Sequence, residues 1–78
     1  MGVTTSVPPT RLSYRQIADD LAARIAAGEY LPGSRLPSYS QIAAIYSVSV
    51  TTAQSAVRLL HERGLTRGEP GRGTFVAD

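Results

Sequence analysis

Uncharged hydrogen-bonding side chains fill the stretch from Leu36 to Val57, which contains no charged residue. Among the residues near its end, those whose side chains could contact base edges are Val50, Thr51, Gln54 and Ser55. The amide of Gln54 can bond both N7 and N6 of adenine, and the methyl groups of Val50 and Thr51 can contact the methyl group of thymine. These residue types predict a surface that contacts base edges. The alternative for Gln54 is an ordinary solvated amide.

Arginine supplies all the positive charge of the chain: its eight basic residues contain no lysine, and the formal net charge is +2. A planar guanidinium suits phosphate oxygens and guanine edges, although an arginine-rich composition also accompanies a GC-rich genome. The arginines that flank the neutral stretch, where they can neutralise phosphates, are Arg35, Arg58, Arg67 and Arg72. For Arg58 and Arg67, a salt bridge with Glu62 or Glu69 is the alternative role.

Two helices and a tight turn are expected to position these side chains. Ser38 begins the first helix, and Gln41 three residues later gives the spacing of a capping box. The apolar residues that give this helix a packing face are Ile42, Ala43, Ile45 and Tyr46. The exposed residues of its first turn are Tyr39, whose hydroxyl can reach a phosphate or remain on the surface, and Ser40.

The second helix is predicted from Val50 to Arg63, with Ser49 as its cap and Gly64 as its stop. Its apolar residues recur at the spacing of an amphipathic helix and are Ala53, Ala56, Val57 and Leu60. A short helix, a turn and a longer helix form a helix-turn-helix, whose second helix lies in the major groove. The amino-terminal ends of both helices can present N–H groups to phosphates.

A supporting helix is predicted upstream, from Ser13, which has Gln16 three residues later, to a stop at Gly28. Its apolar face, to which we assign packing alone, consists of Tyr14, Ile17, Ala18, Leu21, Ala22 and Ile25. On the opposite face, Asp20 and Arg24 have the spacing of a favourable ion pair.

The remaining segments predict a turn and a β-hairpin. A Pro-Gly turn at Glu29–Gly33 precedes a very short strand at Ser34–Leu36. After the last helix, Leu65–Arg67 and Thr74–Val76 have strand composition, and the Gly68–Gly73 segment between them has turn composition. A hairpin beside a helix-turn-helix is a wing, so the predicted fold class is mainly α with a small β-hairpin, a winged helix-turn-helix.

Length and composition indicate one small domain, residues 12–78, after a flexible amino-terminal arm, residues 1–11, that ends at Arg11. The chain has no cysteine and one histidine, His61, so we expect no disulfide, metal site or cofactor. No apolar run reaches the ~20 residues of a membrane span, and the first residues lack the features of a secretion signal. We therefore expect a cytoplasmic, nucleoid-associated protein.

The order of motifs from Leu12 to Val76 resembles the DNA-binding domain of GntR-family bacterial transcription regulators. The matching residues are Tyr14–Ala18, Leu21, Ile25, Gly28, Pro32–Ser38, Val48–Ser49, Thr51–Thr52, Ala56, Leu60, Gly64–Leu65 and Gly71–Val76. The resemblance implies a winged helix-turn-helix that binds operator DNA as a dimer. It also implies that Arg72, between Gly71 and Gly73 at the wing tip, enters the minor groove; the alternative is a purely structural hairpin turn.

The chain departs from the family pattern within the helix-turn-helix. It has Val50 and Gln54 where relatives usually have arginine, Tyr39–Gln41 where they have Glu-Arg-Glu, and Ser47 where they often have glycine. We therefore expect A·T pairs in the half-site where relatives use arginine on guanine. Family members also carry a carboxy-terminal domain that does not fit here, so the chain is either a small standalone regulator or a fragment.

The sequence thus predicts a sequence-specific regulator, expected to be a repressor, that binds double-stranded operator DNA as a homodimer. The predicted DNA-binding residues are Arg35, Ser38, Tyr39, Ser40, Ser49, Val50, Thr51, Gln54, Ser55, Arg58, Arg72 and Gly73. The alternative is a winged-helix module that binds another protein without reading bases. An enzyme is not expected, because there is no paired carboxylate or activated nucleophile and no room for a pocket of ~300 Å³. For the same reason we expect no small-molecule effector site.

Overall fold

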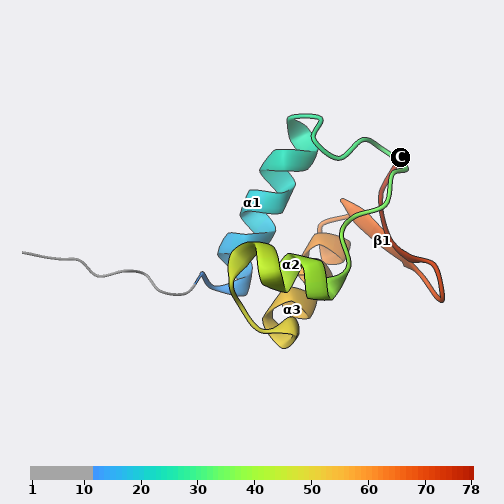
Figure 1. Ribbon diagram of the computed structural model, residues 1–78. Helices are drawn as coiled ribbons and strands as arrows, with labels where there is room; N and C mark the ends of the chain where they lie inside the picture. Colours follow the sequence, from blue (N-terminus) through green and yellow to red (C-terminus); the bar gives the residue numbers. More distant parts are fainter. Residues whose placement is uncertain (1–11) are drawn as a thin grey trace, which may run out of the picture.

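The computed structural model describes residues 12–78, so the predicted arm at residues 1–11, including Arg11, lies outside the described residues. The elements in chain order are α1 (Tyr14–Ala26), α2 (Tyr39–Tyr46), α3 (Val50–Glu62), β1 (Thr66–Glu69) and β2 (Gly73–Val76). Figure 1 shows the three helices grouped together and the hairpin beside them. This arrangement confirms the predicted three helices and wing.

Serine side chains begin all three helices, as predicted. Ser13 forms a capping box with Gln16, and Ser38 forms one with Gln41. In each, the serine hydroxyl accepts a hydrogen bond from the backbone N–H of the glutamine, and the glutamine side chain accepts one from the backbone N–H of the serine. At α3 the Ser49 hydroxyl accepts from the amide of Thr52 at 3.1 Å and donates to its hydroxyl at 3.0 Å. The α3 helix ends at Glu62, one residue before the predicted end, and Arg63 is its carboxy-terminal cap.

The aliphatic core lies where α1 and α2 pack against α3. Its buried residues are Ile17, Ala18, Leu21, Leu36, Ile42, Ala43, Ala53, Ala56, Val57, Leu60 and Val76. The predicted buried face of α3 is therefore confirmed in full. The prediction for Ile45 was wrong, because its side chain is 53% exposed. At about 100° per residue, Ile42, Ala43 and Tyr46 define the packing face of this short helix and Ile45 lies beside it.

The prediction that Tyr14 packs was also wrong, because its side chain is 39% exposed. Tyr14 follows the same helical face as Ile17 and Ala18, which are buried. It occupies the first residue of α1. None of the helices in residues 12–78 is long and apolar enough to cross a membrane.

A third short segment extends the hairpin into a small sheet. The strands β1 and β2 are antiparallel, with Arg67 opposite Phe75. Arg35 pairs with the other side of Phe75, and the Leu36 amide donates to the Thr74 carbonyl at 2.8 Å. The predicted strand at Ser34–Leu36 is thus confirmed as a single bridge. It ties the start of the helix-turn-helix to the wing.

The wing turn is shorter than predicted, because Gly68 and Glu69 belong to β1 and Gly73 begins β2. The amide of Arg72 donates to the carbonyl of Glu69 at 2.9 Å, which closes the turn around Pro70 and Gly71. Gly71 has a φ of +76°, as the third position of a type II turn requires. The predicted Pro-Gly turn after α1 is closed in the same way, by Ser34 and Leu31 at 3.0 Å.

Candidate nucleic-acid interface

The α3 helix presents the predicted polar face to solvent. Thr51, Gln54 and Arg58 are exposed, and Val50 is 43% exposed. Ser55 lies at the edge of this face and is half-buried. Thr52 is also half-buried. Because the aliphatic side of α3 is buried in the core, the helix that carries these exposed side chains is fixed in place.

The amino-terminal ends of α2 and α3 have backbone amides that the helices themselves leave without acceptors. The capping serines bond the amides of Gln41 and Thr52. The earlier first-turn amides, at Tyr39 and Ser40 in α2 and at Val50 and Thr51 in α3, form no hydrogen bond within the described residues. Ser38 and Ser49 are exposed as well. Each end therefore combines N–H donors with the positive end of a helix dipole, the arrangement that favours a phosphate.

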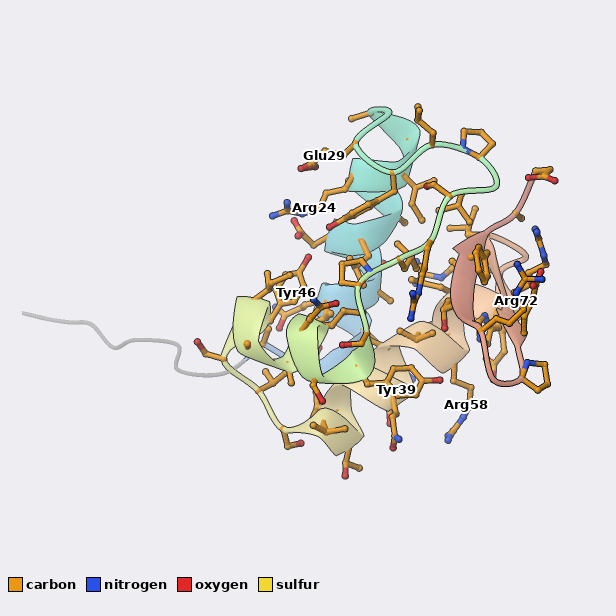
Figure 2. The ribbon with its side chains drawn as sticks, turned by 45° about the vertical axis from the view of Figure 1, so that its right-hand side comes forward. Arg24, Glu29, Tyr39, Tyr46, Arg58 and Arg72 are labelled. Atoms are coloured by element: carbon orange, nitrogen blue, oxygen red, sulfur yellow. The ribbon has the colours of Figure 1, made fainter. Side chains whose placement is uncertain are left out.

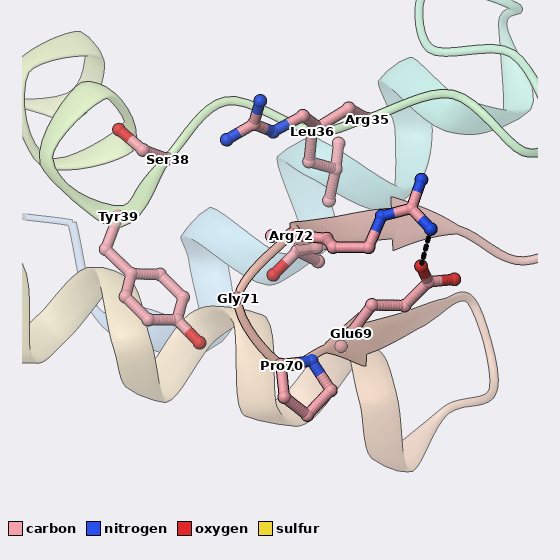
Figure 3. A pocket seen from close by; sticks show the side chains of 11 residues that line it. Arg35, Leu36, Ser38, Tyr39, Glu69, Pro70, Gly71 and Arg72 are labelled. Carbon is pink, nitrogen blue, oxygen red and sulfur yellow. Dashed lines mark ion pairs between the residues drawn. The ribbon is translucent and has the colours of Figure 1, made fainter.

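A cavity of about 570 Å³, open to solvent, lies between the start of α2 and the wing. The expectation that the domain has no room for a pocket of ~300 Å³ was therefore wrong. Figure 3 shows Ser38 and Tyr39 on its α2 side and Glu69, Pro70, Gly71 and Arg72 on its wing side. The predicted site residues that it brings together are Arg35, Ser38, Tyr39, Arg72 and Gly73. The α3 residues do not line it. Figure 2 shows Arg58 projecting away from the ribbon.

The outer face of the wing holds a row of one aromatic and two arginine residues. Arg35, Phe75 and Arg67 lie directly opposite one another on three neighbouring segments of the sheet. The guanidinium of Arg67 lies 5.8 Å from the centre of the Phe75 ring, and that of Arg72 lies 6.0 Å from it. These distances allow cation–π attraction. The sequence analysis missed this row because it depends on strand register.

Gly73 has a structural role in addition to its predicted place in the interface. Its φ is +119°, and a Cβ atom built on it would lie 2.9 Å from Nε of Arg35. The absence of a side chain therefore lets Arg35 cross the wing beside the cavity. The sequence placed both residues in the site but gave no sign that they touch.

Ion pairs divide the arginines into two groups within residues 12–78. Arg24 pairs with Asp20 and Glu29, and Arg63 pairs with Asp19. Arg67 pairs with Glu69 at 3.1 Å, so the salt-bridge alternative for Arg67 is realised. Arg15, Arg35 and Arg58, by contrast, have no acidic partner within the described part of the chain. Arg35 lines the cavity and Arg58 is exposed on α3, so the charges of these two are available there.

Two polar contacts that support the site were not predicted. The Tyr46 hydroxyl donates to the Asp20 carboxylate at 2.5 Å and joins α2 to α1. Burial, and then the hydrogen bond to Asp20, raise the pKa of Tyr46, while the hydrogen bonds from Tyr46 and Arg24 lower the pKa of Asp20. His61 Nδ1 lies 2.6 Å from the hydroxyl of the buried Thr66, where α3 meets β1.

Comparison with known proteins connects this geometry to a family. A family model described as "Bacterial regulatory proteins, gntR family" matches residues 13–76. The mannosyl-D-glycerate transport/metabolism system repressor MngR of Escherichia coli (strain K12) is 40% identical over 65 residues, which cover 83% of this chain and 27% of that protein. The uncharacterized HTH-type transcriptional regulator YhcF of Bacillus subtilis (strain 168) is 35% identical over 65 residues, covering 83% of this chain and 54% of that protein.

The solved structures extend the comparison to three dimensions. The crystal structure of AraR(DBD) in complex with operator ORX1 matches with a TM-score of 0.80 at 28% sequence identity. The match covers 96% of this chain and 92% of that chain. By contrast, the chain spans about a quarter of MngR and about half of YhcF.

Proposed function

This chain belongs to the gntR family of bacterial regulatory proteins and has the winged helix-turn-helix of its DNA-binding domains, and on that basis we propose that it reads a specific sequence in double-stranded operator DNA. The observation that carries the proposal is that one side of α3 is buried and the other side is exposed. Its aliphatic side is buried while Val50, Thr51 and Gln54 face solvent. The family and its fold are those of transcriptional regulators rather than enzymes.

The proposed interface separates base contacts from phosphate contacts. The base-reading residues are Val50, Thr51, Gln54 and Ser55, with Gln54 on adenine and the methyl groups of Val50 and Thr51 against thymine. The phosphate-contacting groups are the first-turn amides and hydroxyls of Ser38, Tyr39, Ser40 and Ser49, together with Arg35 and Arg58. Arg72, beside Gly73 at the wing tip, enters the adjacent minor groove, where narrow A·T-rich geometry attracts arginine.

We infer further that the protein is a repressor that acts as a homodimer. One relative, MngR, is named as a repressor, and helix-turn-helix proteins commonly place two copies on half-sites one helical turn apart. A single half-site offers few base contacts, so a second copy on a palindrome would raise the affinity. The proposed location is the bacterial cytoplasm, on the nucleoid, without a small-molecule effector site in this chain.

A selection experiment tests the proposed function. The protein is incubated with a pool of random duplexes at about 0.1 M salt, where non-specific attraction is still appreciable, and the bound DNA is sequenced. Enrichment of a palindromic motif with A·T pairs in each half-site is the expected result. Salt-dependent binding without any enriched motif would overturn specific readout. Absence of binding at low salt would favour the alternative, a winged helix that contacts another protein.

A further inference from the structure

Glu69 is the one acidic residue among those that line the cavity between α2 and the wing. Its Oε2 lies 3.1 Å from Nε of Arg67, and its Oε1 lies 3.8 Å from Nη1 of Arg72. The Glu69 side chain is 31% exposed, whereas that of Arg72 is 73% exposed. The carboxylate therefore lies between the two guanidinium groups, and Arg72 is the partner that solvent reaches (Figure 3).

The two arginines are held to different degrees. Arg67 also donates from Nη1 to the Val76 carbonyl at 3.4 Å, so its guanidinium is anchored to the sheet backbone. Arg72 has no polar side-chain partner except Glu69 within residues 12–78, apart from its position near the Phe75 ring. A separation of 3.8 Å in a solvent-exposed pair corresponds to a weak interaction that salt reduces. Arg72 can therefore exchange the carboxylate for another anion.

From these contacts we propose that Glu69 is a positioning residue that holds Arg72 along the wing in the free protein and releases it to the DNA on binding. This inference rests on the proposed function. The type II turn at Pro70–Gly71 places Glu69 and Arg72 at its two ends, so release needs only a rotation of the Arg72 side chain. The bound DNA must compete with the carboxylate, and Glu69 thus lowers the affinity for every duplex.

Three substitutions at Glu69 and Arg72 separate this effect from simple repulsion between Glu69 and DNA. Glu69→Gln keeps the shape of the side chain and removes its charge. Glu69→Asp keeps the charge, but the shorter side chain no longer reaches Arg72. Arg72→Ala removes the group that the carboxylate holds. The matched control is Glu62→Gln, which makes the same change in net charge on an exposed residue without an ion pair in the described chain.

The experiment measures equilibrium binding to a random-sequence duplex of about 30 base pairs, roughly three helical turns, at about 50 mM salt. We expect Glu69→Gln to bind about twofold more tightly than the wild type, the equivalent of about 0.4 kcal/mol from a weak exposed pair, and Glu69→Asp to show part of this gain. In the Arg72→Ala background both gains should disappear, while Glu62→Gln should have the same small effect in either background. Thermal unfolding of each variant verifies that the wing is folded.

Each other outcome has a definite meaning. A gain from Glu69→Gln that persists in the Arg72→Ala background, with none from Glu69→Asp, would replace the proposal with direct repulsion. Weaker or unchanged binding by folded Glu69→Gln would show that Glu69 supports the wing rather than restrains Arg72. Loss of wild-type binding to any duplex would overturn the proposed function and this inference together. Wild-type binding that equals the binding of both Glu69 variants, together with weaker binding by Arg72→Ala, would overturn the inference alone.

Discussion

The hydroxyl of Tyr46 lies 2.5 Å from Oδ2 of Asp20, and the same oxygen accepts a hydrogen bond from Nε of Arg24 at 2.8 Å. Tyr46 is the last residue of α2 and Asp20 lies in the middle of α1. The contact thus fixes the end of α2 from which the chain turns toward α3. Figure 2 shows Tyr46 and Arg24 on the same side of the molecule. The orientation of α3 therefore depends partly on a polar contact outside the proposed interface.

Replacing Tyr46 by phenylalanine should lower the free energy of unfolding by about 1 kcal/mol, the typical net value of one such hydrogen bond. The ring remains packed, so the loss measures the hydroxyl alone. Urea denaturation at neutral pH provides the measurement. The control is Tyr39→Phe, whose hydroxyl has no hydrogen bond within residues 12–78 and whose side chain is 37% exposed. Equal stability of the two variants would contradict the structural role of the Tyr46 hydroxyl.

The same contact predicts a dependence of stability on acid pH. The hydrogen bond from Tyr46, followed by that from Arg24, lowers the pKa of Asp20 in the folded protein. A carboxyl group with a lowered folded pKa stabilises the protein above its unfolded pKa of about 3.9, and this contribution is lost as the pH falls through the folded pKa. The free energy of unfolding should therefore decrease below about pH 4, and Asp20→Asn should make that decrease shallower.

The size of this acid effect should be small, because the Asp20 side chain is 45% exposed and solvent screens the pair. Urea denaturation at several pH values compares the wild type, Asp20→Asn and the control Asp19→Asn, whose carboxylate is 65% exposed and pairs with Arg63. The control should retain most of the wild-type slope. An identical acid profile for the wild type and Asp20→Asn would show that Asp20 makes no such contribution.

Ser47 ends α2 in the left-handed conformation, with φ +57° and ψ +47°. A residue with a Cβ atom pays about 1–2 kcal/mol for this conformation, whereas glycine adopts it freely. Ser47→Gly should therefore raise the stability by up to about 1 kcal/mol, or about 4–8 °C in the melting temperature of a domain of this size. Ser47→Ala keeps the Cβ atom and serves as the control. A melting temperature of Ser47→Gly at or below that of Ser47→Ala would contradict the prediction.

Local signals in the sequence predicted most of the fold. The serine caps at Ser13, Ser38 and Ser49 and the apolar spacing of α3 are properties of one turn or one helix, so the sequence displays them directly. The exposed face with Thr51 and Gln54 follows from the same periodicity. The prediction that these side chains face solvent is therefore confirmed.

The unpredicted features depend on contacts between distant segments. The Tyr46–Asp20 hydrogen bond joins residues 26 positions apart, and the packing of Arg35 on Gly73 depends on the register of the bridge to Phe75. Neither leaves a periodic pattern in the chain. The same applies to Ile45, because it lies at the edge of the α2 packing face and its burial depends on how α2 lies on the rest of the domain.

Gly73→Ala should impair both the fold of the wing and the binding of DNA. The added Cβ would lie 2.9 Å from Nε of Arg35, at a φ of +119°, and backbone strain of this kind costs about 1–3 kcal/mol. Gly64→Ala is the matched control, since its φ is +77° but nothing lies within 4 Å of its Cβ position. Both variants should have lower melting temperatures. Gly73→Ala alone should also displace Arg35 and weaken duplex binding measured below its melting temperature.

Gln54→Ala should relax the choice of base at one position of each half-site and leave the fold unchanged, because Gln54 is exposed on α3. A bidentate contact to adenine accounts for about 1–3 kcal/mol of discrimination, so the preference at that position should fall by roughly tenfold or more. The measurement is competition between the selected operator and operators with each base at that position.

Arg58→Ala is the comparison, because loss of a phosphate contact should weaken binding to all of these operators equally and reduce the slope of log K against log salt by about 0.9. A selected motif with guanine opposite Gln54, or an unchanged base preference in Gln54→Ala, would contradict the adenine contact and leave the exposed amide as an ordinary surface group.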